Sequence, residues 1–424
     1  MRSAMLLPTP VIVNYAQTRG RIATTAEAVI SVTPTARDGV EGARMVAALD
    51  HAEGVLRNHQ HHADVLTAPD DRMASLLQSF VAARALEAGK VDVLPGQRTL
   101  EAKFDPNDWA GWVGSFFTWV RGLRPHPWIP APSVPDTFPN HARIAVLGDW
   151  GTGLYGAPVC ASAIERDAHP LDLVIHLGDV YYSGTSREVG ERFIALWPRR
   201  TDALSRAVNS NHEMYSGGHA YFDITLRVFR QSSSVFVLRN DHWLLIGLDT
   251  AYAEHDLAED QAGWVNRLCD ASEERRVIFF SHHQPFSLFE KGGEKLLAHL
   301  ADLIATRRIF AWYWGHEHRC VIFDRDPESG FHGRCVGHSG FPYFRDSFDG
   351  VNEAHRVGDH VFYRFGPGRR GPGGIVLDGD NGYVPGHERE YGPHGYMTIE
   401  LDGPRLHERV HAADGDVLWE QTIS

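Results

Sequence analysis

The sequence predicts an α/β fold, because short apolar runs of strand length alternate with helix-length segments over residues 142–320. A proline-rich stretch precedes this region and separates it from an N-terminal part with a helical pattern. Three further apolar runs, bounded by turn residues, follow near the C-terminal end. These observations predict a domain with a largely parallel or mixed sheet covered by helices, preceded by a helical N-terminal region.

Residues 1–135 are expected to form this helical region and the linker. Hydrophobic residues recur at helical spacing from Glu41 to Lys90, whereas residues 1–40 show no clear period. The aromatic stretch 109–119 lacks a face rich in Lys and Arg, so we expect it to dock on the following domain rather than on a membrane. The prolines from Pro125 to Pro139 predict an extended boundary.

A catalytic domain is expected over residues 142–424, with its core motifs in 142–320. Its predicted strands are Arg143–Leu147, Leu173–Leu177, Ala207-Val208, Val235–Leu238, Trp243–Leu248, Val277–Phe280 and Ile309–Trp314. The predicted helices are 159–167, 188–197, 259–271 and 294–306. Residues 321–395 are rich in Gly, Pro and aromatic residues and predict long loops. Three strands are expected at 396–401, 405–411 and 417–423.

Composition excludes several classes of function. The net charge of −13 over 424 residues disfavours a nucleic acid as an obligate partner. No apolar stretch reaches the roughly 20 residues of a membrane span, and the stretch Met1–Pro8 is a poor signal peptide. The four cysteines include no Cys-x-x-Cys pair and fit a reducing compartment. We therefore expect a cytoplasmic protein that acts on a small molecule, and the oligomeric state stays open.

Seven candidate metal ligands follow the predicted strands directly. They are Asp149, Asp179, Tyr182, Asn211, His283, His316 and His318. Ligands of open α/β sheets gather at the carboxyl ends of the strands, so these loops are expected to converge on one crevice. Oxygen ligands mixed with imidazole suit Fe, Mn or Zn. The set is large enough to hold two metal ions side by side.

Two adjacent metal ions indicate hydrolysis of a phosphoester. Metals roughly 3.5–4 Å apart clamp a phosphoryl group and turn a bound water into a hydroxide that attacks phosphorus in line. A carboxylate between two cations bridges them, and Asp179 is the candidate. His212 stands next to Asn211 and is expected to stabilise or protonate the leaving oxygen.

Five motifs in this order resemble those of the calcineurin-like metallophosphoesterases. They are Asp149-Trp150-Gly151, Gly178-Asp179-Val180-Tyr181-Tyr182, Asn211-His212-Glu213, His283-Gln284-Pro285 and Gly315-His316-Glu317-His318. The first motif lacks the histidine of many members and the second supplies Tyr182, which resembles the purple acid phosphatase branch. The resemblance is strong over 142–320, loose over the final strands, and leaves 1–135 unexplained.

The resemblance implies a four-layer α/β/β/α sandwich with two mixed sheets. It also implies two metal ions, Fe(III) with Fe, Zn or Mn. The first metal would be held by Asp149, Asp179, Tyr182 and His318, and the second by Asn211, His283 and His316, with Asp179 bridging.

Three points leave alternatives open. His282 and His283 compete as the ligand of the fourth motif, and the spacing to Pro285 favours His283, with His282 as a candidate substrate contact. His338 is either another substrate contact or a structural histidine. Ser210 stands where the family usually has glycine before Asn-His, which is expected to strain that loop or alter the pocket modestly.

Phosphomonoester hydrolysis, as in an acid phosphatase, is the predicted function. Phosphodiester hydrolysis, including that of cyclic nucleotides, is the alternative, because the same metal core serves both. A third hypothesis is a non-catalytic, metal-stabilised binding protein. The intact set of ligands and the presence of His212 argue against it.

Overall fold

The computed structural model describes residues 123–200, 203–272, 274–368 and 371–423, together with 70–87 and single positions among 47–58 and at 120. The predictions for residues 1–40 and for the aromatic stretch 109–119 lie outside this part. Among the described residues, no helix combines the length and the hydropathy needed to cross a bilayer.

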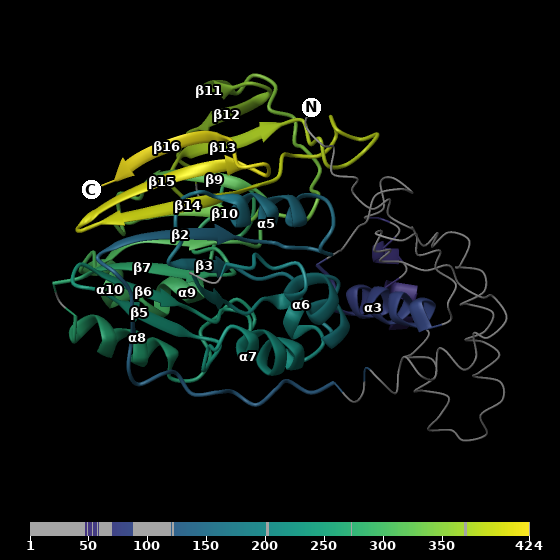
Figure 1. Cartoon of the computed structure of the whole chain (residues 1–424), viewed down its shortest axis with the longest axis horizontal. Coiled ribbons are helices and arrows are strands. Elements are labelled where there is room, and N and C mark those ends of the chain that lie inside the picture. Colours follow the sequence, from purple (N-terminus) through teal and green to yellow (C-terminus); the bar gives the residue numbers. More distant parts are fainter. Residues whose placement is uncertain are drawn as a thin grey trace.

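Two mixed sheets form the framework of the molecule (Figure 1). One has ten strands in the order β1 (Asp136–Thr137), β5 (Phe236–Arg239), β6 (Trp243–Gly247), β7 (Arg276–Ser281), β8 (Ile309–Trp314), β10 (His332–Val336), β9 (Cys320–Arg325), β13 (Gly374–Gly379), β12 (His360–Phe365) and β11 (Asn352–Val357). The other has six, in the order β16 (Val417–Ile423), β15 (Arg405–Ala412), β14 (Gly395–Asp402), β2 (His141–Leu147), β3 (Leu173–His176) and β4 (Leu204–Ala207).

The inner faces of the two sheets pack against each other and make the central core. Ile144 and Ile175 of the smaller sheet belong to the same buried cluster as Leu245, Ile278 and Tyr313 of the larger one. Strands β3 and β6 are buried along their whole length, since both faces of each sheet are covered. This explains why they appear in the sequence as continuous apolar runs.

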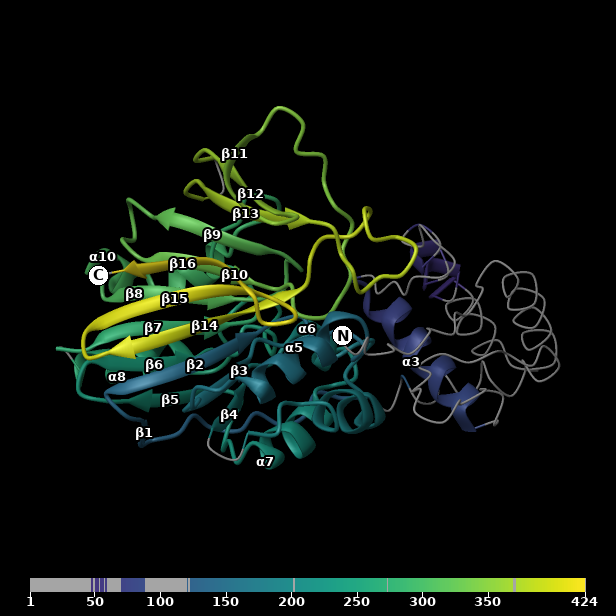
Figure 2. The same ribbon diagram turned by 45° about the horizontal axis from the view of Figure 1, so that its top comes forward.

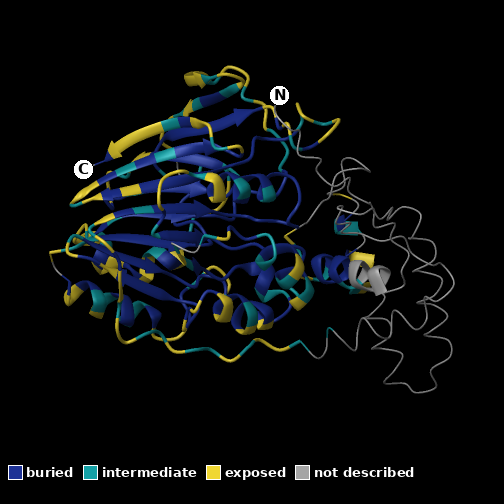
Figure 3. Cartoon of the chain, in the orientation of Figure 1, coloured by how far each residue is buried: buried dark blue, intermediate teal, exposed yellow. Residues whose placement is uncertain are grey.

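Helices cover both outer faces. The smaller sheet carries α5 (Gly156–Arg166) and two π-helical turns, η1 (Glu188–Ile194) and η2 (Tyr221–Thr225). The larger sheet carries α8 (Gln261–Asp270), α9 (Glu294–His299) and α10 (Ala301–Ala305). Other helices of the described residues are α3 (Arg72–Glu87), α6 (Asn211–Met214) and α7 (Leu226–Val228). Buried residues lie inside these layers and exposed ones outside (Figure 3). The predicted four-layer α/β/β/α sandwich is therefore confirmed.

The largest departure from the predicted elements lies in residues 321–395. Loops are predicted there, but strands β9 to β13 extend the larger sheet (Figure 2). Strand β11 is almost wholly exposed at the edge of the sheet, so its sequence has no apolar alternation to indicate a strand. The helix predicted at 294–306 is also divided, at Leu300, into α9 and α10.

Candidate metal centre

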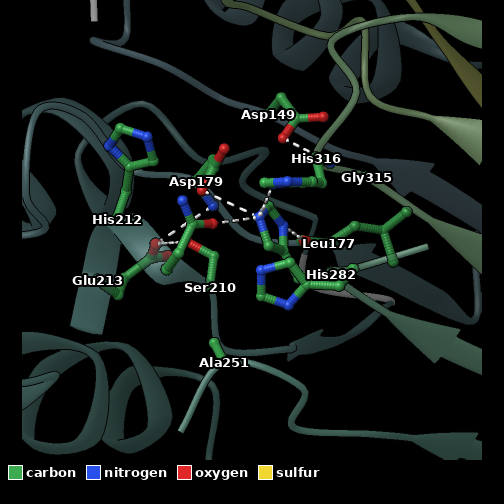
Figure 4. A network of polar contacts seen from close by, with 12 residues as sticks. Asp149, Leu177, Asp179, Ser210, His212, Glu213, Ala251, His282, Gly315 and His316 are labelled. Carbon is green, nitrogen blue, oxygen red and sulfur yellow. Dashed lines mark hydrogen bonds and ion pairs between the residues drawn. The ribbon is translucent and has the colours of Figure 1, made fainter. Parts of the chain in front are cut away.

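Five loops meet at one edge of the sandwich, and each follows the carboxyl end of a strand. The loops after β2, β3 and β4 leave three adjacent parallel strands of the smaller sheet. Those after β7 and β8 leave two parallel strands of the larger one. Parallel strands of each sheet end at the same edge, which brings all five loops together. Their polar side chains converge there, as Figure 4 shows for Asp149, Asp179, His282 and His316.

One group of ligand atoms surrounds Nε2 of His282. This nitrogen lies 2.8 Å from Asn211 Oδ1, 3.3 Å from Asp179 Oδ1 and 3.2 Å from His316 Nδ1. His282 Nδ1 is 2.8 Å from the carbonyl oxygen of Leu177, so the ring proton is donated there and Nε2 presents a lone pair. In the neutral ring, Nε2 and the two oxygens therefore face one another as acceptors. A cation bound between these atoms would accept their lone pairs and remove their mutual repulsion.

A second group lies on the other side of Asp179. Asp149, Asp179 and His318 place one ligand atom each within 4.8 Å of the others. The hydroxyl of Tyr181 donates to Asp179 Oδ2 at 2.9 Å and lies 2.5 Å from His318 Nε2. Asp179 thus presents Oδ1 to the first group and Oδ2 to this one. A carboxylate in that position is suited to bridge two ions.

The charges of the two carboxylates show why a cation fits. Asp149 and Asp179 are fully buried. Burial and the repulsion by Asp179 raise the pKa of Asp149 well above its usual range. Burial also acts to raise the pKa of Asp179, but the imidazoles of His282 and His212 outweigh it and hold that pKa well below the usual range. A bound metal ion would remove the repulsion and keep both groups ionised.

The donor set therefore fits the predicted metals. Ligand atoms about 2.1 Å from one ion lie roughly 3 Å apart when they subtend a right angle, which is the spacing around His282 Nε2. Within the described residues, Asp149 Oδ2 and Asp179 Oδ1 are buried and form no hydrogen bond. Oxygens left in this state are satisfied by a cation.

The backbone of these loops is shaped to aim the ligands. Asp149, Asp179, His316 and His318 all have a positive φ, between 51° and 73°. This conformation is uncommon for residues other than glycine and costs on the order of 1–3 kcal/mol each. Two glycines give the side chains room: a Cβ at Gly178 would lie 2.8 Å from His282 Nδ1, and one at Gly337 would lie 2.2 Å from Asp149 Oδ2.

Two buried glutamates hold the loops that follow β3 and β4. Glu213 accepts the N–H groups of Asp179 and Val180 at 3.2 and 3.3 Å, and burial raises its pKa to about 8. Glu188 accepts the N–H of Tyr182 at 2.8 Å. The hydroxyl of Ser210 donates to Glu213, and the φ of Ser210 is −131°. Serine in place of glycine therefore brings no backbone strain here.

His212, the predicted leaving-group acid, is held firmly beside the ligands. Its Nδ1 lies 2.6 Å from the carbonyl oxygen of Tyr182, which can only accept a proton. Its ring packs on that of Tyr181 with centroids 3.9 Å apart. Burial lowers the pKa of His212, partly offset by Asp179 and Asp70. The remaining nitrogen, Nε2, is the atom available to carry a proton to a substrate.

Three predicted site residues lie elsewhere than expected. His282 rather than His283 meets Asp179 and Asn211, because His282 is the first residue after β7 and turns inward. The hydroxyl of Tyr182 is buried and forms no hydrogen bond within the described residues, whereas Tyr181 reaches Asp179. His338 is fully buried beside His394, a position that suits a structural histidine rather than a substrate contact.

His283 belongs to a third cluster with His255 and His316. Its Nδ1 is 3.0 Å from the hydroxyl of Thr250, and its Nε2 is buried. The rings of His255 and His283 are in tilted contact, with centroids 3.7 Å apart. Two imidazoles on one ion would place their centroids roughly 5 Å apart, given metal–nitrogen bonds of about 2.1 Å. This spacing disfavours a third metal ion at the cluster.

Asp70 is a further residue of the site that the motifs do not indicate. It precedes α3 and accepts a hydrogen bond from Asn211 Nδ2 at 2.7 Å. The sequence around it carries only the signal of a helix start.

A family model, calcineurin-like phosphoesterase, matches residues 142–320. No curated protein matches the sequence. Similar solved structures include a purple acid phosphatase from seeds of yellow lupin (Lupinus luteus), with 16% identity, a TM-score of 0.47 and coverage of 70% of this chain and 55% of that one. The chain thus spans little more than half of that protein.

Two other solved structures are similar at 12% identity. PhoD has a TM-score of 0.41, with 69% of this chain and 70% of that one covered. A predicted phosphoesterase from Streptococcus pneumoniae has a TM-score of 0.31, with coverage of 67% and 98%. Likenesses this distant carry no argument about activity. The family model covers the five loops described above, so residues 142–320 carry a calcineurin-like phosphoesterase domain, the catalytic domain of metal-dependent phosphoester hydrolases.

Proposed function

We propose that the chain hydrolyses phosphomonoesters at a centre of two metal ions. The observation that carries the proposal is the convergence of potential ligand atoms around His282 Nε2, next to a carboxylate whose two oxygens face different groups. The first motif without histidine and a tyrosine oxygen beside Asp179 support a centre like that of purple acid phosphatases, with iron and a second Fe, Zn or Mn ion.

The residues divide between two ions as follows. Asp149, Asp179, Tyr181 and His318 would hold one ion, and Asp179, Asn211, His282 and His316 the other. Bound there, the two ions would neutralise the phosphoryl oxygens and make a water acidic enough to attack at ordinary pH.

The chain itself supplies the proton for the leaving group. The contact of His212 Nδ1 with the Tyr182 carbonyl leaves Nε2 to hold the transferable proton when the ring is in its imidazolium form, and packing against Tyr181 keeps the ring from turning. Because the imidazole is fixed before substrate arrives, little rotational freedom is lost at the transition state. His212 is therefore proposed as the general acid.

The test combines metal analysis with a pair of substrates. Protein purified without chelator should contain about two metal ions, including iron, and should hydrolyse p-nitrophenyl phosphate faster than bis(p-nitrophenyl) phosphate. Asp179→Asn should lose both metal and turnover. Two ions with faster turnover of the diester would replace the proposal by a phosphodiesterase. If the protein holds two ions tightly but hydrolyses neither substrate, a metal-stabilised binding protein would be favoured.

A second experiment separates the two adjacent histidines. His282→Ala should remove one metal ion per chain, because Nε2 of this residue lies among the acceptors. His283→Ala is the matched control and should keep both ions. Loss of metal in the His283 variant alone would show that His283 is the ligand, as the spacing of the fourth motif predicts.

The cellular setting stays a prediction. All four cysteines are buried thiols, which supports the expected cytoplasmic location. A small phosphoester remains the proposed substrate, since the acidic chain disfavours long polyanions.

A further inference from the structure

The chain ahead of the phosphoesterase domain reaches the metal centre. Helix α3 lies against the loops after β3 and β4 (Figures 1 and 2). The hydroxyl of Ser79 is 2.6 Å from that of Ser183 and donates to Glu188 at 2.7 Å, and all three side chains are buried. Arg72 Nε donates to the carbonyl oxygen of Tyr215 at 3.1 Å. The helix is thus anchored on the loops that carry the candidate ligands.

Asp70, just before this helix, contacts the candidate ligand Asn211 directly. Its Oδ1 accepts from Asn211 Nδ2 at 2.7 Å and from the hydroxyl of Tyr215. Asn211 Nδ2 also lies 3.1 Å from the Tyr215 hydroxyl oxygen. The three side chains form a closed triangle at the outer side of the Asn211 amide.

This triangle decides which way the amide faces. The two ends of a carboxamide have nearly the same shape, so hydrogen bonds alone distinguish them. The carboxylate of Asp70 can only accept, and it therefore requires the amide nitrogen on its side. The amide oxygen is then left on the inner side, 2.8 Å from His282 Nε2, where a metal ligand is needed. With the amide reversed, a nitrogen that cannot bind a cation would face the ion.

We propose that Asp70 is a positioning residue of the metal centre, which fixes the Asn211 amide with its oxygen toward the second metal ion. The inference rests on the proposed binuclear centre and gives the N-terminal region a role in it. Hydrogen-bond partners of metal ligands typically contribute 10–100-fold in metal affinity. Loss of the Asp70 carboxylate should lower the affinity for one metal ion by that factor. The affinity for the other ion, which Asn211 does not contact, should stay unchanged.

The test measures metal affinity in the full chain by titrating metal-free protein with Zn²⁺ against a chromophoric chelator. Wild type should show two sites, and Asp70→Ala should weaken one of them about 10–100-fold. Asp70→Asn keeps an oxygen that can accept from Asn211 and should recover most of the affinity. Asp71→Ala is the matched control: Asp71 accepts the N–H of Ala74 at the helix start, 2.8 Å away, and does not bond Asn211.

The outcomes separate this inference from the proposed function. Two wild-type sites with unchanged affinities in Asp70→Ala would overturn the positioning role alone. Equal losses in the Ala and Asn variants would also overturn it, because charge rather than hydrogen bonding would then be responsible. Fewer than two wild-type sites would overturn the binuclear centre itself. If Asp70→Ala melts at a lower temperature than Asp71→Ala, the metal affinity of Asp70→Asn is compared with that of wild type instead. A strong loss of metal affinity in Asp70→Asn would contradict the positioning role.

Discussion

At the level of single residues, Tyr181 determines what the group of Asp149, Asp179 and His318 can bind. Burial raises the pKa of Tyr181 well above its usual range, since Asp179 and Asp149 add negative charge around it. A phenolate there needs a trivalent or divalent cation to form. The hydroxyl of Tyr181 already lies between Asp179 Oδ2 and His318 Nε2, where such a cation would be bound.

We therefore predict that the iron-loaded protein is coloured and that Tyr181→Phe removes the visible tyrosinate band. Tyr182→Phe is the matched control and should keep the band, because its hydroxyl forms no contact with Asp179 or His318 among the described residues. Visible spectra of both variants at equal iron content test this. Loss of the band only in Tyr182→Phe would show that Tyr182, as the motif spacing predicts, and not Tyr181 binds the iron.

His212→Ala should slow hydrolysis by about 10²–10⁴-fold for substrates with poor leaving groups, the usual contribution of a general acid. Metal content should stay at the wild-type value. His219→Ala, which removes a histidine bonded to the carbonyl of Arg124 instead, is the control. Rates for a series of aryl and alkyl phosphates give the measurement. A loss that does not depend on the leaving group would exclude the acid role.

At the scale of elements, the strand-end loops were predictable and their side-chain directions were not. Strands β2, β3, β7 and β8 follow from apolar runs, so the positions of the loops after them follow too. The choice between neighbours such as His282 and His283 depends on which way a tight turn points each side chain. Sequence spacing alone does not determine this direction, and the positive φ at Asp179 and His316 makes it harder still to predict for those two ligands.

Contacts between distant segments are the other part that sequence does not indicate. Asp70 reaches Asn211 across 141 positions of the chain. A helix start has the same sequence pattern whether or not it is docked on an active site, so no local signal marks Asp70. Strand β11 escapes prediction for a related reason, because its pairing with β12 rather than an apolar pattern makes it a strand.

His338, just after β10, and His394, just before β14, form a buried pair that makes stability depend on pH. Burial and the neighbouring His394 lower the pKa of His338 to about 3, and burial lowers that of His394 to about 4. In the unfolded chain histidine titrates near 6.5. As the pH falls below about 6.5, the unfolded state takes up protons that the folded state refuses, so stability present above that pH is lost progressively toward pH 4.

His338→Gln should therefore flatten the loss of stability between pH 6.5 and 4.5, whatever its stability at pH 7. Denaturant midpoints at several pH values for wild type and variant measure the two slopes. His141→Gln, at an exposed position, provides the control. Parallel slopes in the His338 variant and the wild type would contradict the contribution of the buried pair.

At the scale of the whole molecule, one buried ion pair joins the two sheets. Arg334 on β10 donates to Glu408 on β15 through Nε at 2.8 Å and Nη2 at 2.5 Å. The hydroxyl of Tyr313 on β8 donates to the same carboxylate at 2.9 Å. Arg334 Nη1 donates to the carbonyl oxygens of Phe323 and Gly333. The pair is almost completely inaccessible to water and fixes how the sheets face each other.

Glu408→Ala should destabilise the fold by about 3–5 kcal/mol, because it leaves the Arg334 guanidinium buried without a counter-charge. Glu400→Ala breaks an exposed pair with Arg409 in the same sheet and should cost less than about 1 kcal/mol. Equilibrium unfolding in denaturant measures both. A similar, small cost for the two variants would show that the buried pair adds little to the cohesion of the sheets.

The order of strands in the smaller sheet has a consequence for synthesis of the protein. β2 lies between β3 and β14, although β14 begins at Gly395, more than two hundred positions later in the chain. While the ribosome is still making the residues before β14, β2 has an open edge, and the turns carrying Asp149 and Asp179 rest on an incomplete sheet. Contacts this distant in sequence form late. The nascent protein is therefore expected to acquire tight metal binding only after the final hairpin has emerged, and a chain interrupted before that point would leave aggregation-prone strands exposed.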